Sequence, residues 1–463
     1  MKKQIIVIVS IVCSLLVGSF ISADDPGAAI QSQAQRSLGL MLQNISRPDA
    51  AKGSVVAAPS KANPDYFFHW IRDAALVMDS LVQLYSRSGG AQKQMLHTYL
   101  MDYISFSRKN QLTPNRSGGL GEPKFEADGS AFQGDWGRPQ NDGPALRAMT
   151  LIHLAHALIR EGQMSFVRQT LYDGKIPTNT VIKADLEYVA HHWQEFSFDP
   201  WEEVGGNHFY TTFVSRGAMI QGAALAQALG DTGAAAFYRQ QAQAITQAMN
   251  QFWDAQHNVF LETRGGARGK SGLDTAVILA VLHGESGDGF LAPTSDGVIS
   301  TFYALMTAFE KIYPINQDSK VAPAIGRYPE DVYNGTGTSE GNPWFLTTLA
   351  YAEFCNRLRV EYAHAGAIHV TSLNQAFLNL LLQGHGSAQP GTTISSGSPE
   401  FSAVVSGLGV MGDKFFETVL LHKGADGSLS EQINRHQGFM QGAPNLSWSH
   451  ASFITATLSR GAR

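Results

Sequence analysis

Three carboxylates lie close together in the segment Asp199-Pro200-Trp201-Glu202-Glu203, and large aromatic side chains flank them. Like charges that are partly buried together cannot all ionise at low cost, so at least one of these groups should keep its proton to a higher pH than usual. A carboxylic acid that stays protonated near the working pH is what a general acid requires. The alternative is a solvated acidic loop, and composition alone leaves both interpretations open.

A second candidate for acid–base chemistry, Glu431, lies far along the chain in a segment of small residues, Gly427 to Gln432. Hydrolysis of a glycosidic bond with inversion needs one carboxyl group as acid and another as base, about 6.5–9.5 Å apart, with a water molecule between them. Two such groups need not be close in sequence. The alternative for Glu431 is an acid at a helix N-terminus, where it would interact favourably with the helix dipole.

Trp70, Arg72 and Asp73 stand at the start of an apolar helical pattern that follows the aromatic run from Tyr66. Aromatic rings can stack on the apolar faces of sugars, and Arg and Asp can hydrogen-bond vicinal hydroxyl groups, so these residues suit a concave pocket with a few polar groups. The alternative is an N-terminal Asp cap beside core aromatics. Two further loops, 122–144 and 326–344, repeat the mixture of Trp or Tyr with Arg and carboxylates.

Other chemistries find little support. His191 and His192 are adjacent rather than helically spaced, so a metal site is not indicated, and we expect no cofactor. The run Gly265 to Ser271 lacks the first glycine of a phosphate-binding loop, and no strand-to-helix Gly-x-Ser-x-Gly turn is present. With 34 Lys+Arg, 39 Asp+Glu and a net charge of −5, the chain has no basic run for a nucleic-acid partner.

Apolar residues recur at three and four positions over much of the chain, which predicts helices, whereas strand-like alternation is scarce. The sequence therefore predicts an all-α fold, although periodicity cannot show whether the helices close into a ring. The predicted helices cover Ala28–Ile45, Ile71–Tyr85, Lys93–Tyr103, Gly143–Ile159, Tyr210–Leu229, Thr232–Phe252, Leu273–Leu282, Gly297–Tyr313, Trp344–Arg359, Leu373–Leu382, Glu400–Leu421 and Trp448–Leu458.

Taken together, six segments resemble glucoamylases of glycoside hydrolase family 15, and they occur in the order of that family. The segments are PDYFFHWIRD (64–73), GLGEPKFEADGSAFQGDWGRPQNDGPALR (119–147), DPWEEV (199–204), RYPEDVY (327–333), GNPWFL (341–346) and GSLSEQ (427–432). The resemblance covers the chain from about residue 28 to its end.

The resemblance implies a single (α/α)6 barrel and inverting hydrolysis of α-1,4 and, more slowly, α-1,6 linkages, with release of β-D-glucose from non-reducing ends of starch, glycogen and malto-oligosaccharides. It implies Glu202 as general acid and Glu431 as general base. The substrate-binding residues that it implies are Tyr66, Trp70, Arg72, Asp73, Trp136, Trp201, Glu203, Arg327, Tyr333 and Trp344.

The chain departs from the family pattern at a few positions. Pro200 stands where Leu is usual, Phe132 where Tyr is usual and His69 where Thr is usual, and Thr336 to Glu340 resembles an insertion beside the outer subsites. The departures leave open the alternative that this chain is a related family enzyme that acts on trehalose or dextran-type oligosaccharides. A sugar-binding protein without catalysis is a further alternative, against which the pair Glu202 and Glu431 argues.

The first residues have the pattern of an export signal. Lys2 and Lys3 precede an apolar run from Ile5 to Phe20, and Ile21-Ser22-Ala23 offers a cleavage point. We therefore expect a signal peptide over 1–23, one catalytic domain over 24–463, and a secreted or periplasmic monomer with no membrane contact after cleavage. The alternative is an uncleaved anchor helix, for which the apolar run is short. Cleavage would leave Cys355 as a single thiol, expected in the core.

Overall fold

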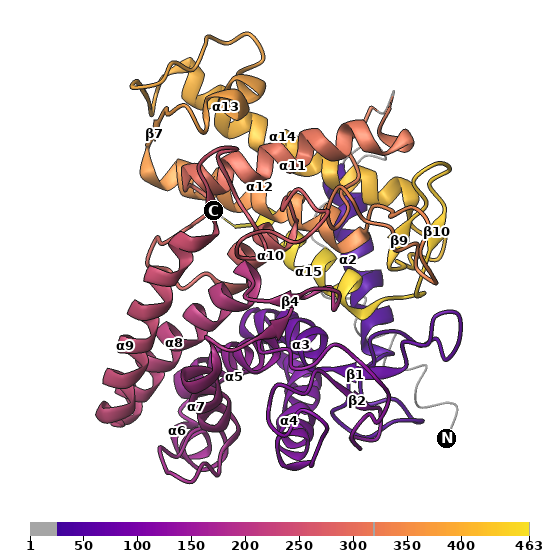
Figure 1. Ribbon diagram of the computed structural model, residues 1–463, viewed down its shortest axis with the longest axis vertical. Helices are drawn as coiled ribbons and strands as arrows, with labels where there is room; N and C mark the ends of the chain where they lie inside the picture. Colours follow the sequence, from indigo (N-terminus) through magenta and orange to yellow (C-terminus); the bar gives the residue numbers. More distant parts are fainter. Residues whose placement is uncertain (1–25, 318–319, 463) are drawn as a thin grey trace.

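The computed structural model describes residues 26–317 and 320–462, and helices form nearly all of its regular structure (Figure 1). The expected signal peptide, residues 1–23, lies outside the described residues. Six helices form an inner ring. They are α3 (Ile71–Arg87), α5 (Asp142–Arg160), α8 (Phe209–Leu229), α10 (Ala276–Gly284), α12 (Phe345–Ala365) and α15 (Ser447–Arg460).

The inner ring closes on itself. Helix α3 contacts α5, and the sequence of contacts continues through α8, α10 and α12 to α15, which returns to contact α3. Closure of this ring is the feature that helical periodicity left undecided. The all-α prediction is confirmed, and the arrangement is an (α/α)6 barrel in a single domain.

A second set of helices packs around the inner ring. These outer helices are α2 (Pro26–Leu42), α4 (Gly90–Leu112), α7 (Val181–His192), α9 (Thr232–Ala248), α11 (Asp296–Ile312) and α14 (Pro399–His422). Each of them contacts the inner helix beside it, for example α2 on α15 and α9 on α8. A further helix, α13 (Gln375–Leu382), and the strands β7 (Ala367–His369) and β8 (Thr393–Ser395) lie at the top of Figure 1, apart from the ring.

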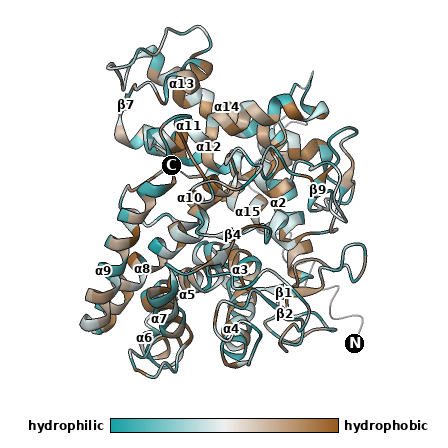
Figure 2. Ribbon diagram, in the orientation of Figure 1, coloured by the Kyte–Doolittle hydropathy of each residue, from teal (hydrophilic) through white to brown (hydrophobic). Residues whose placement is uncertain are grey.

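Burial separates the two sets of helices. The inner helix α5 buries side chains on all of its faces, as expected for a helix surrounded by others. The outer helix α9 buries only Ala235, Tyr238, Ala242 and Ile245, whose spacing of three and four places them on one stripe. Hydrophobic and hydrophilic residues accordingly alternate along α9 in Figure 2.

Local sequence signals define several helix ends. Gly230, with φ of 86°, ends α8 in the left-handed conformation that glycine adopts without steric cost. Asp231 then caps α9, because its side chain accepts a hydrogen bond from the backbone N–H of Ala234 at 3.2 Å. Ser398 and Pro399 begin α14 in the same manner, with the Ser398 hydroxyl bound to the N–H of Phe401 at 3.0 Å.

Two described α-helices were missing from the sequence prediction, the single turn α6 (Met164–Phe166) and α7. Helix α7 was not predicted because charged residues occupy its buried face, so its apolar pattern is broken. Asp185 in α7 forms a buried ion pair with Arg147 of α5 at 2.6 Å, and Lys183 is buried beside it. Helix α4 is also longer than predicted, since its polar second half continues to Leu112.

Short antiparallel strand pairs shape one end of the barrel. Strand β1 (Phe68–Trp70) pairs with β2 (Lys124–Glu126), β3 (Ser197–Phe198) with β4 (Gly205–Gly206), and β9 (Gln432–Ile433) with β10 (Met440–Gln441). These strands belong to the loops that lead into inner helices. A fourth pair, β5 (Trp253–Asp254) and β6 (Val259–Phe260), lies between α9 and α10.

Among the described residues, no helix combines the length and apolar content that a membrane crossing requires. Cys355 lies in α12 and is fully buried, and burial raises the pKa of its thiol. The prediction of a core cysteine is therefore confirmed.

Candidate active site

A cavity of about 440 Å³ lies among the loops that precede the inner helices. All of the catalytic and substrate-binding residues predicted from the sequence line it. They are Tyr66, Trp70, Arg72, Asp73, Trp136, Trp201, Glu202, Glu203, Arg327, Tyr333, Trp344 and Glu431. The lining also includes Pro200, which the sequence analysis named as a departure from the family pattern. Residues to which it gave no role complete the lining: Pro64, Asp65, Gly137, Leu446 and Trp448.

Helix N-termini surround this cavity. Arg72 and Asp73 are in the first turn of α3, Trp344 directly precedes α12, and Trp448 is in the first turn of α15. The N-terminal end of a helix carries partial positive charge and unpaired N–H groups. The ring of inner helices therefore directs its positive ends toward a site that holds several carboxylates.

Donors surround both oxygens of the Glu202 carboxylate. Its Oε1 accepts hydrogen bonds from Trp70 Nε1 at 2.8 Å and from Gln140 Nε2 at 3.0 Å, and it also accepts one from Arg72 Nη2 at 3.2 Å. Its Oε2 accepts one from Trp136 Nε1 at 2.9 Å. The carboxylate is thus held in one orientation by groups from two segments, 70–72 and 136–140.

The backbone also fixes Glu202. Its φ angle of 69° lies in the left-handed region, which a side chain with a Cβ rarely adopts and which costs about 1–3 kcal/mol. Its N–H group bonds to the carbonyl oxygen of Asp199 at 2.9 Å, closing a turn. The paired strands β3 and β4 hold the two ends of this loop together.

The acidic loop is partly buried, so the solvated-loop interpretation is wrong for Asp199 and Trp201, which are both buried. Burial raises the pKa of Asp199, although its carboxylate accepts the N–H groups of Glu203 and Val204 at 2.7 and 2.8 Å. The expectation that one carboxyl of this cluster holds its proton to a higher pH is confirmed for Asp199.

Arg72 connects three carboxylates at the base of the cavity. Its guanidinium group bonds to Asp142 Oδ2 at 2.9 Å and to Glu202, and its Nε lies 3.7 Å from Asp73 Oδ2. Burial raises the pKa of Asp73 to about 7 against the opposing effect of Arg72. Asp73 therefore presents a carboxyl group that can both donate and accept hydrogen bonds near neutral pH.

Glu431 is fully buried and lies in a loop rather than at a helix end. It directly precedes β9, so the helix-dipole interpretation is wrong. Tyr66 donates its hydroxyl hydrogen to Oε1 at 2.8 Å, and Oε2 has no hydrogen-bond partner among the described residues. Burial raises the pKa of Glu431 to about 8, although Tyr66 and Arg327 oppose the shift.

The two glutamates lie on the same cavity and are connected only through aromatic side chains. Glu431 bonds to Tyr66, the ring of Tyr66 lies 5.5 Å from the ring of Trp70, and the indole of Trp70 bonds to Glu202. No hydrogen bond joins the two carboxyl groups in the described part of the chain. A ligand in the cavity can therefore contact both of them at once.

A second ion-pair cluster occupies one wall of the cavity. Arg327 Nη2 bonds to Glu203 Oε1 at 2.7 Å, and Arg327 also forms a two-bond contact with Asp331 at 2.6 and 2.8 Å. Burial alone would raise the pKa of Glu203, but Arg327, Tyr328 and Lys270 together lower it. Glu203 is therefore held as an ionised hydrogen-bond acceptor.

Aromatic side chains form the rest of the lining. The guanidinium carbon of Arg327 lies 5.2–5.5 Å from the ring centres of Trp201, Tyr333 and Trp344. Trp201 is fixed by a hydrogen bond from its Nε1 to Asp274 Oδ1 at 2.8 Å. The surface offered to a ligand is thus mainly aromatic, with a few polar groups at fixed positions.

Sequence reasoning overlooked Gln140, which bonds to both Glu202 and Arg72. It also overlooked Trp448, although a Trp at the start of a predicted helix is the signal that identified Trp70. Trp448 separates the cavity from a smaller one of about 140 Å³ inside the inner ring. Among the described residues, no group of three or more His, Cys, Asp or Glu side chains could hold a metal ion.

Comparisons with known proteins agree with this geometry. The family model Glycosyl hydrolases family 15 matches residues 35–458. The chain is 39% identical over 440 residues to a glucoamylase of Blastobotrys adeninivorans, which spans 93% of this chain and 70% of that protein. It is 39% identical over 437 residues to glucoamylase 1 of Rhizopus oryzae, with the same coverage of both chains.

Solved structures are similar over nearly the whole chain. The glucoamylase of Saccharomycopsis fibuligera superposes with a TM-score of 0.86 at 31% identity, covering 97% of this chain and 98% of that one. The family 15 glucoamylase of Hypocrea jecorina also gives 0.86, at 33% identity, covering 94% of this chain and 72% of that one. With its closed double ring of helices and its two glutamates on one cavity, this chain belongs to glycosyl hydrolase family 15.

Proposed function

We propose that this chain is a glucoamylase: an exo-acting, inverting glycoside hydrolase. It releases β-D-glucose from the non-reducing ends of starch, glycogen and malto-oligosaccharides, cleaving α-1,4 linkages and, more slowly, α-1,6 linkages. The observation that carries the proposal is the placement of Glu202 and Glu431 on one cavity without a direct bond between them. Two carboxyl groups on one cavity, with no hydrogen bond between them, suit inversion with a water molecule as nucleophile.

In this mechanism Glu202 is the general acid. Its proton passes to the glycosidic oxygen as the bond from C1 to that oxygen breaks, and the leaving sugar departs with a free hydroxyl group. Glu431 is the general base. It takes a proton from the water molecule that attacks C1 from the opposite face, so the product is the β-anomer.

The oxygen of Glu431 that has no hydrogen-bond partner among the described residues supports the role of base. Because Oε2 has no partner among the described residues, it can accept a hydrogen bond from the attacking water. A donor at this position favours the ionised carboxylate and therefore opposes the effect of burial on its pKa.

The shape of the cavity supports cleavage from chain ends. Trp448 and the first turn of α3, with Arg72 and Asp73, contribute to its lining, and beyond Trp448 lies only the separate smaller cavity. A terminal glucose could place its ring against Trp448 and bond its hydroxyl groups to Arg72 and Asp73. We also propose that Tyr66, Trp70, Trp136, Trp201, Glu203, Arg327, Tyr333 and Trp344 bind substrate, as expected from the family resemblance.

The test is to incubate the purified protein with maltose, isomaltose, trehalose and starch and to follow the product anomers by NMR. We expect β-glucose first, with maltose and starch cleaved faster than isomaltose. Initial α-glucose would overturn the inverting mechanism. Preferred cleavage of trehalose or of α-1,6 linkages would identify one of the related specificities, and binding without cleavage would identify a sugar-binding protein.

We further propose that the chain acts outside the cytoplasm, as a monomer without a membrane anchor. The support is the amino-terminal pattern of Lys2, Lys3 and the apolar run to Phe20. Family membership does not decide location, because one relative carries the name intracellular sporulation-specific glucoamylase. Amino-terminal sequencing of the secreted protein, with a new start near Asp24, and its mass in solution would test both statements.

A further inference from the structure

Four aromatic rings form a closed cage beside Glu202, and we refer to Phe68, Trp70, Phe132 and Trp136 as the aromatic cage. Each ring meets the next one edge to face. The centroid distances are 5.9 Å for Phe68–Trp70, Trp70–Trp136 and Phe132–Trp136, and 5.3 Å for Phe68–Phe132. Edge-to-face contacts of this length are a favourable arrangement of aromatic pairs.

The ammonium group of Lys124 lies inside the aromatic cage. Its Nζ is 3.7–4.5 Å from the centroids of all four rings, within the range of a cation–π contact. Only 2% of the Lys124 surface is exposed, which is unusual for a lysine. Strand pairing places it there, because Lys124 in β2 is the register partner of Trp70 in β1.

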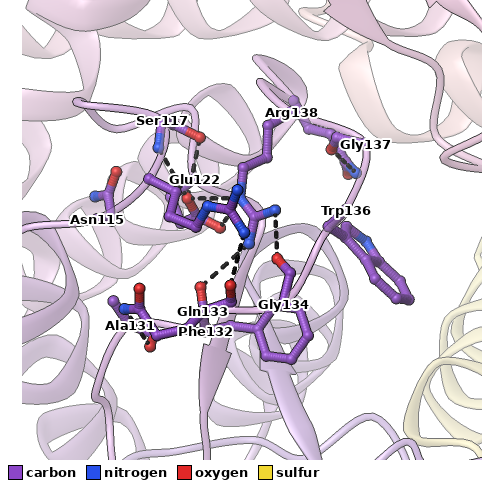
Figure 3. Close-up of polar contacts among 12 residues, drawn as sticks. Asn115, Ser117, Glu122, Ala131, Phe132, Gln133, Gly134, Trp136, Gly137 and Arg138 are labelled. Atoms are coloured by element: carbon purple, nitrogen blue, oxygen red, sulfur yellow. Dashed lines mark hydrogen bonds and ion pairs between the residues drawn. The ribbon is translucent and has the colours of Figure 1, made fainter.

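An ion pair anchors the far side of the cage. The loop 132–138 carries Phe132 and Trp136, and Arg138 spans this loop by bonding to the carbonyl oxygens of Phe132 and Gly134 at 3.2 and 3.0 Å. Arg138 is itself bound to the buried carboxylate of Glu122 at 2.8 Å. Figure 3 shows this arrangement, with Trp136 projecting from the loop.

Two members of the aromatic cage hold the proposed general acid. Trp70 donates to Oε1 of Glu202, and Trp136 donates to Oε2. Trp136 is 38% exposed, so protein packing covers only part of its ring. The 3.7 Å contact with the Lys124 ammonium, on the inner side of the cage, is the closest of the four cation–ring contacts.

We propose that Lys124 is a positioning residue of the hydrolytic reaction. Its ammonium group holds the rings of Trp70 and Trp136 in the orientation in which their N–H groups fix the Glu202 carboxyl. Lys124 does not line the cavity, so it acts on the substrate only through these rings. The inference rests on the proposed role of Glu202 as general acid.

The charge of Lys124 is maintained over the range in which the enzyme would work. Burial lowers the pKa of Lys124 to about 8. The carboxylates of Glu202, Asp65 and Glu126 oppose this shift, and Arg138 adds to it. The ammonium form therefore predominates below about pH 8. Kinetic comparisons of variants at pH 5–6 are made where Lys124 in the cage is charged.

The test is Lys124→Met, which keeps an unbranched side chain that packs well against aromatic rings but removes the charge. We expect kcat on maltose to fall by about 10- to 100-fold, because misplacement of a catalytic group is costly, with KM within about 3-fold. On p-nitrophenyl α-glucoside, whose leaving group needs little protonation, kcat should fall by no more than about 3-fold. Lys124→Arg should restore part of the maltose activity.

Controls separate this inference from general damage and from the proposed function. Lys93→Met removes another lysine that lies over a ring, Tyr85 at 4.8 Å, far from the site on α4, and should leave both substrates unaffected. If Lys124→Met does not fold, Phe132→Leu opens one wall of the cage, and Phe132 neither bonds to Glu202 nor lines the cavity itself. This variant should also lose more activity on maltose than on p-nitrophenyl α-glucoside, by a smaller factor than Lys124→Met.

Equal losses on maltose and p-nitrophenyl α-glucoside in Lys124→Met, or in Phe132→Leu where it replaces that variant, would overturn the positioning role. So would unchanged kinetics. Glu202→Gln is measured in parallel. If that variant shows no dependence on the leaving group, the assignment of the general acid fails. If it shows the dependence and the cage variants do not, only the inference about Lys124 fails.

Discussion

Tyr66 donates its hydroxyl hydrogen to one oxygen of Glu431 at 2.8 Å, while the other oxygen of that carboxylate has no partner among the described residues. The same hydroxyl lies 3.0 Å from the hydroxyl of Tyr333. Glu431 is thus oriented through one oxygen, while the other, also buried, keeps its capacity to accept a hydrogen bond. This division suits a general base, which must be held in place without losing its acceptor site.

Glu431→Gln should abolish most turnover while leaving binding intact. Glutamine has nearly the same shape but cannot take a proton, so we expect kcat on maltose to fall by about 10²- to 10⁴-fold. Calorimetry should show maltose affinity within a few-fold of the unchanged protein. Glu195→Gln, on an exposed carboxylate that does not line the cavity, is the matched control. Near-normal turnover of Glu431→Gln would remove this residue as base.

Glu202→Gln should affect substrates according to their leaving groups. Maltose needs protonation of the departing oxygen, whereas p-nitrophenolate departs readily, so the loss should be at least about 10-fold greater on maltose. Steady-state kinetics on both substrates measure the ratio. Equal losses would point to a different acid.

Tyr66→Phe should shift the acid side of the pH–activity profile to higher pH. The base must be ionised, and the hydrogen bond from Tyr66 lowers the pKa of Glu431 against the effect of burial, which raises it to about 8. Loss of this bond raises the pKa further, so a larger share of the enzyme is protonated at a given low pH. The measurement is kcat/KM for maltose between pH 3 and 10, and an unshifted acid limb would contradict the prediction.

Gly442→Ala should damage catalysis more than it damages the fold. A Cβ at Gly442 would lie 2.2 Å from Oε2 of Glu431, so the carboxylate must move. We expect a fall in kcat of about 100-fold, in line with a displacement of about 1 Å. Gly287→Ala is a close control, because Gly287 has the same φ of 73° but open space around it. A similar kcat loss in both variants would assign the effect to backbone strain.

Asp274→Asn should make stability less dependent on pH. Burial raises the pKa of Asp274 from 3.8 to about 8, so its protonated form is favoured in the folded state. Its contribution to stability is complete below about pH 4 and is lost as the pH rises through 8. Asparagine can still accept the bond from Trp201. The Tm of the variant should rise relative to the Tm of the unchanged protein as the pH increases from 5 to 8. Asp135→Asn, at an exposed carboxylate, is the control. A difference in Tm that stays constant over this pH range would contradict the prediction.

Much of the site could be predicted because its residues are conspicuous by type. In the sequence, Trp, Arg and acidic residues lie close together in predicted loops, as Trp201 does beside Glu202. In the structure, all of the predicted site residues line one cavity. Their roles come from family resemblance, since spacing along the chain cannot place Glu431 opposite Glu202. That placement depends on the closure of the inner ring, which brings α15 beside α3.

Residues that break the usual burial rules escaped prediction. Helix α7 was missed because Lys183 and Asp185 are buried on it with charged partners, whereas helix prediction relies on apolar faces. Lys124 was overlooked for a similar reason, since lysine is expected at the surface. Gln140 has no charge and no ring, and only its side-chain hydrogen bonds with Arg72 and Glu202 reveal its place in the site.

The contacts of α15 with α2 and α3 have a consequence for synthesis of the protein. Glu431 and the closing helix α15 are synthesised long after Trp70 and Arg72, which line the same cavity. The site is therefore incomplete on a nascent chain until α15 has been made and has docked against α3.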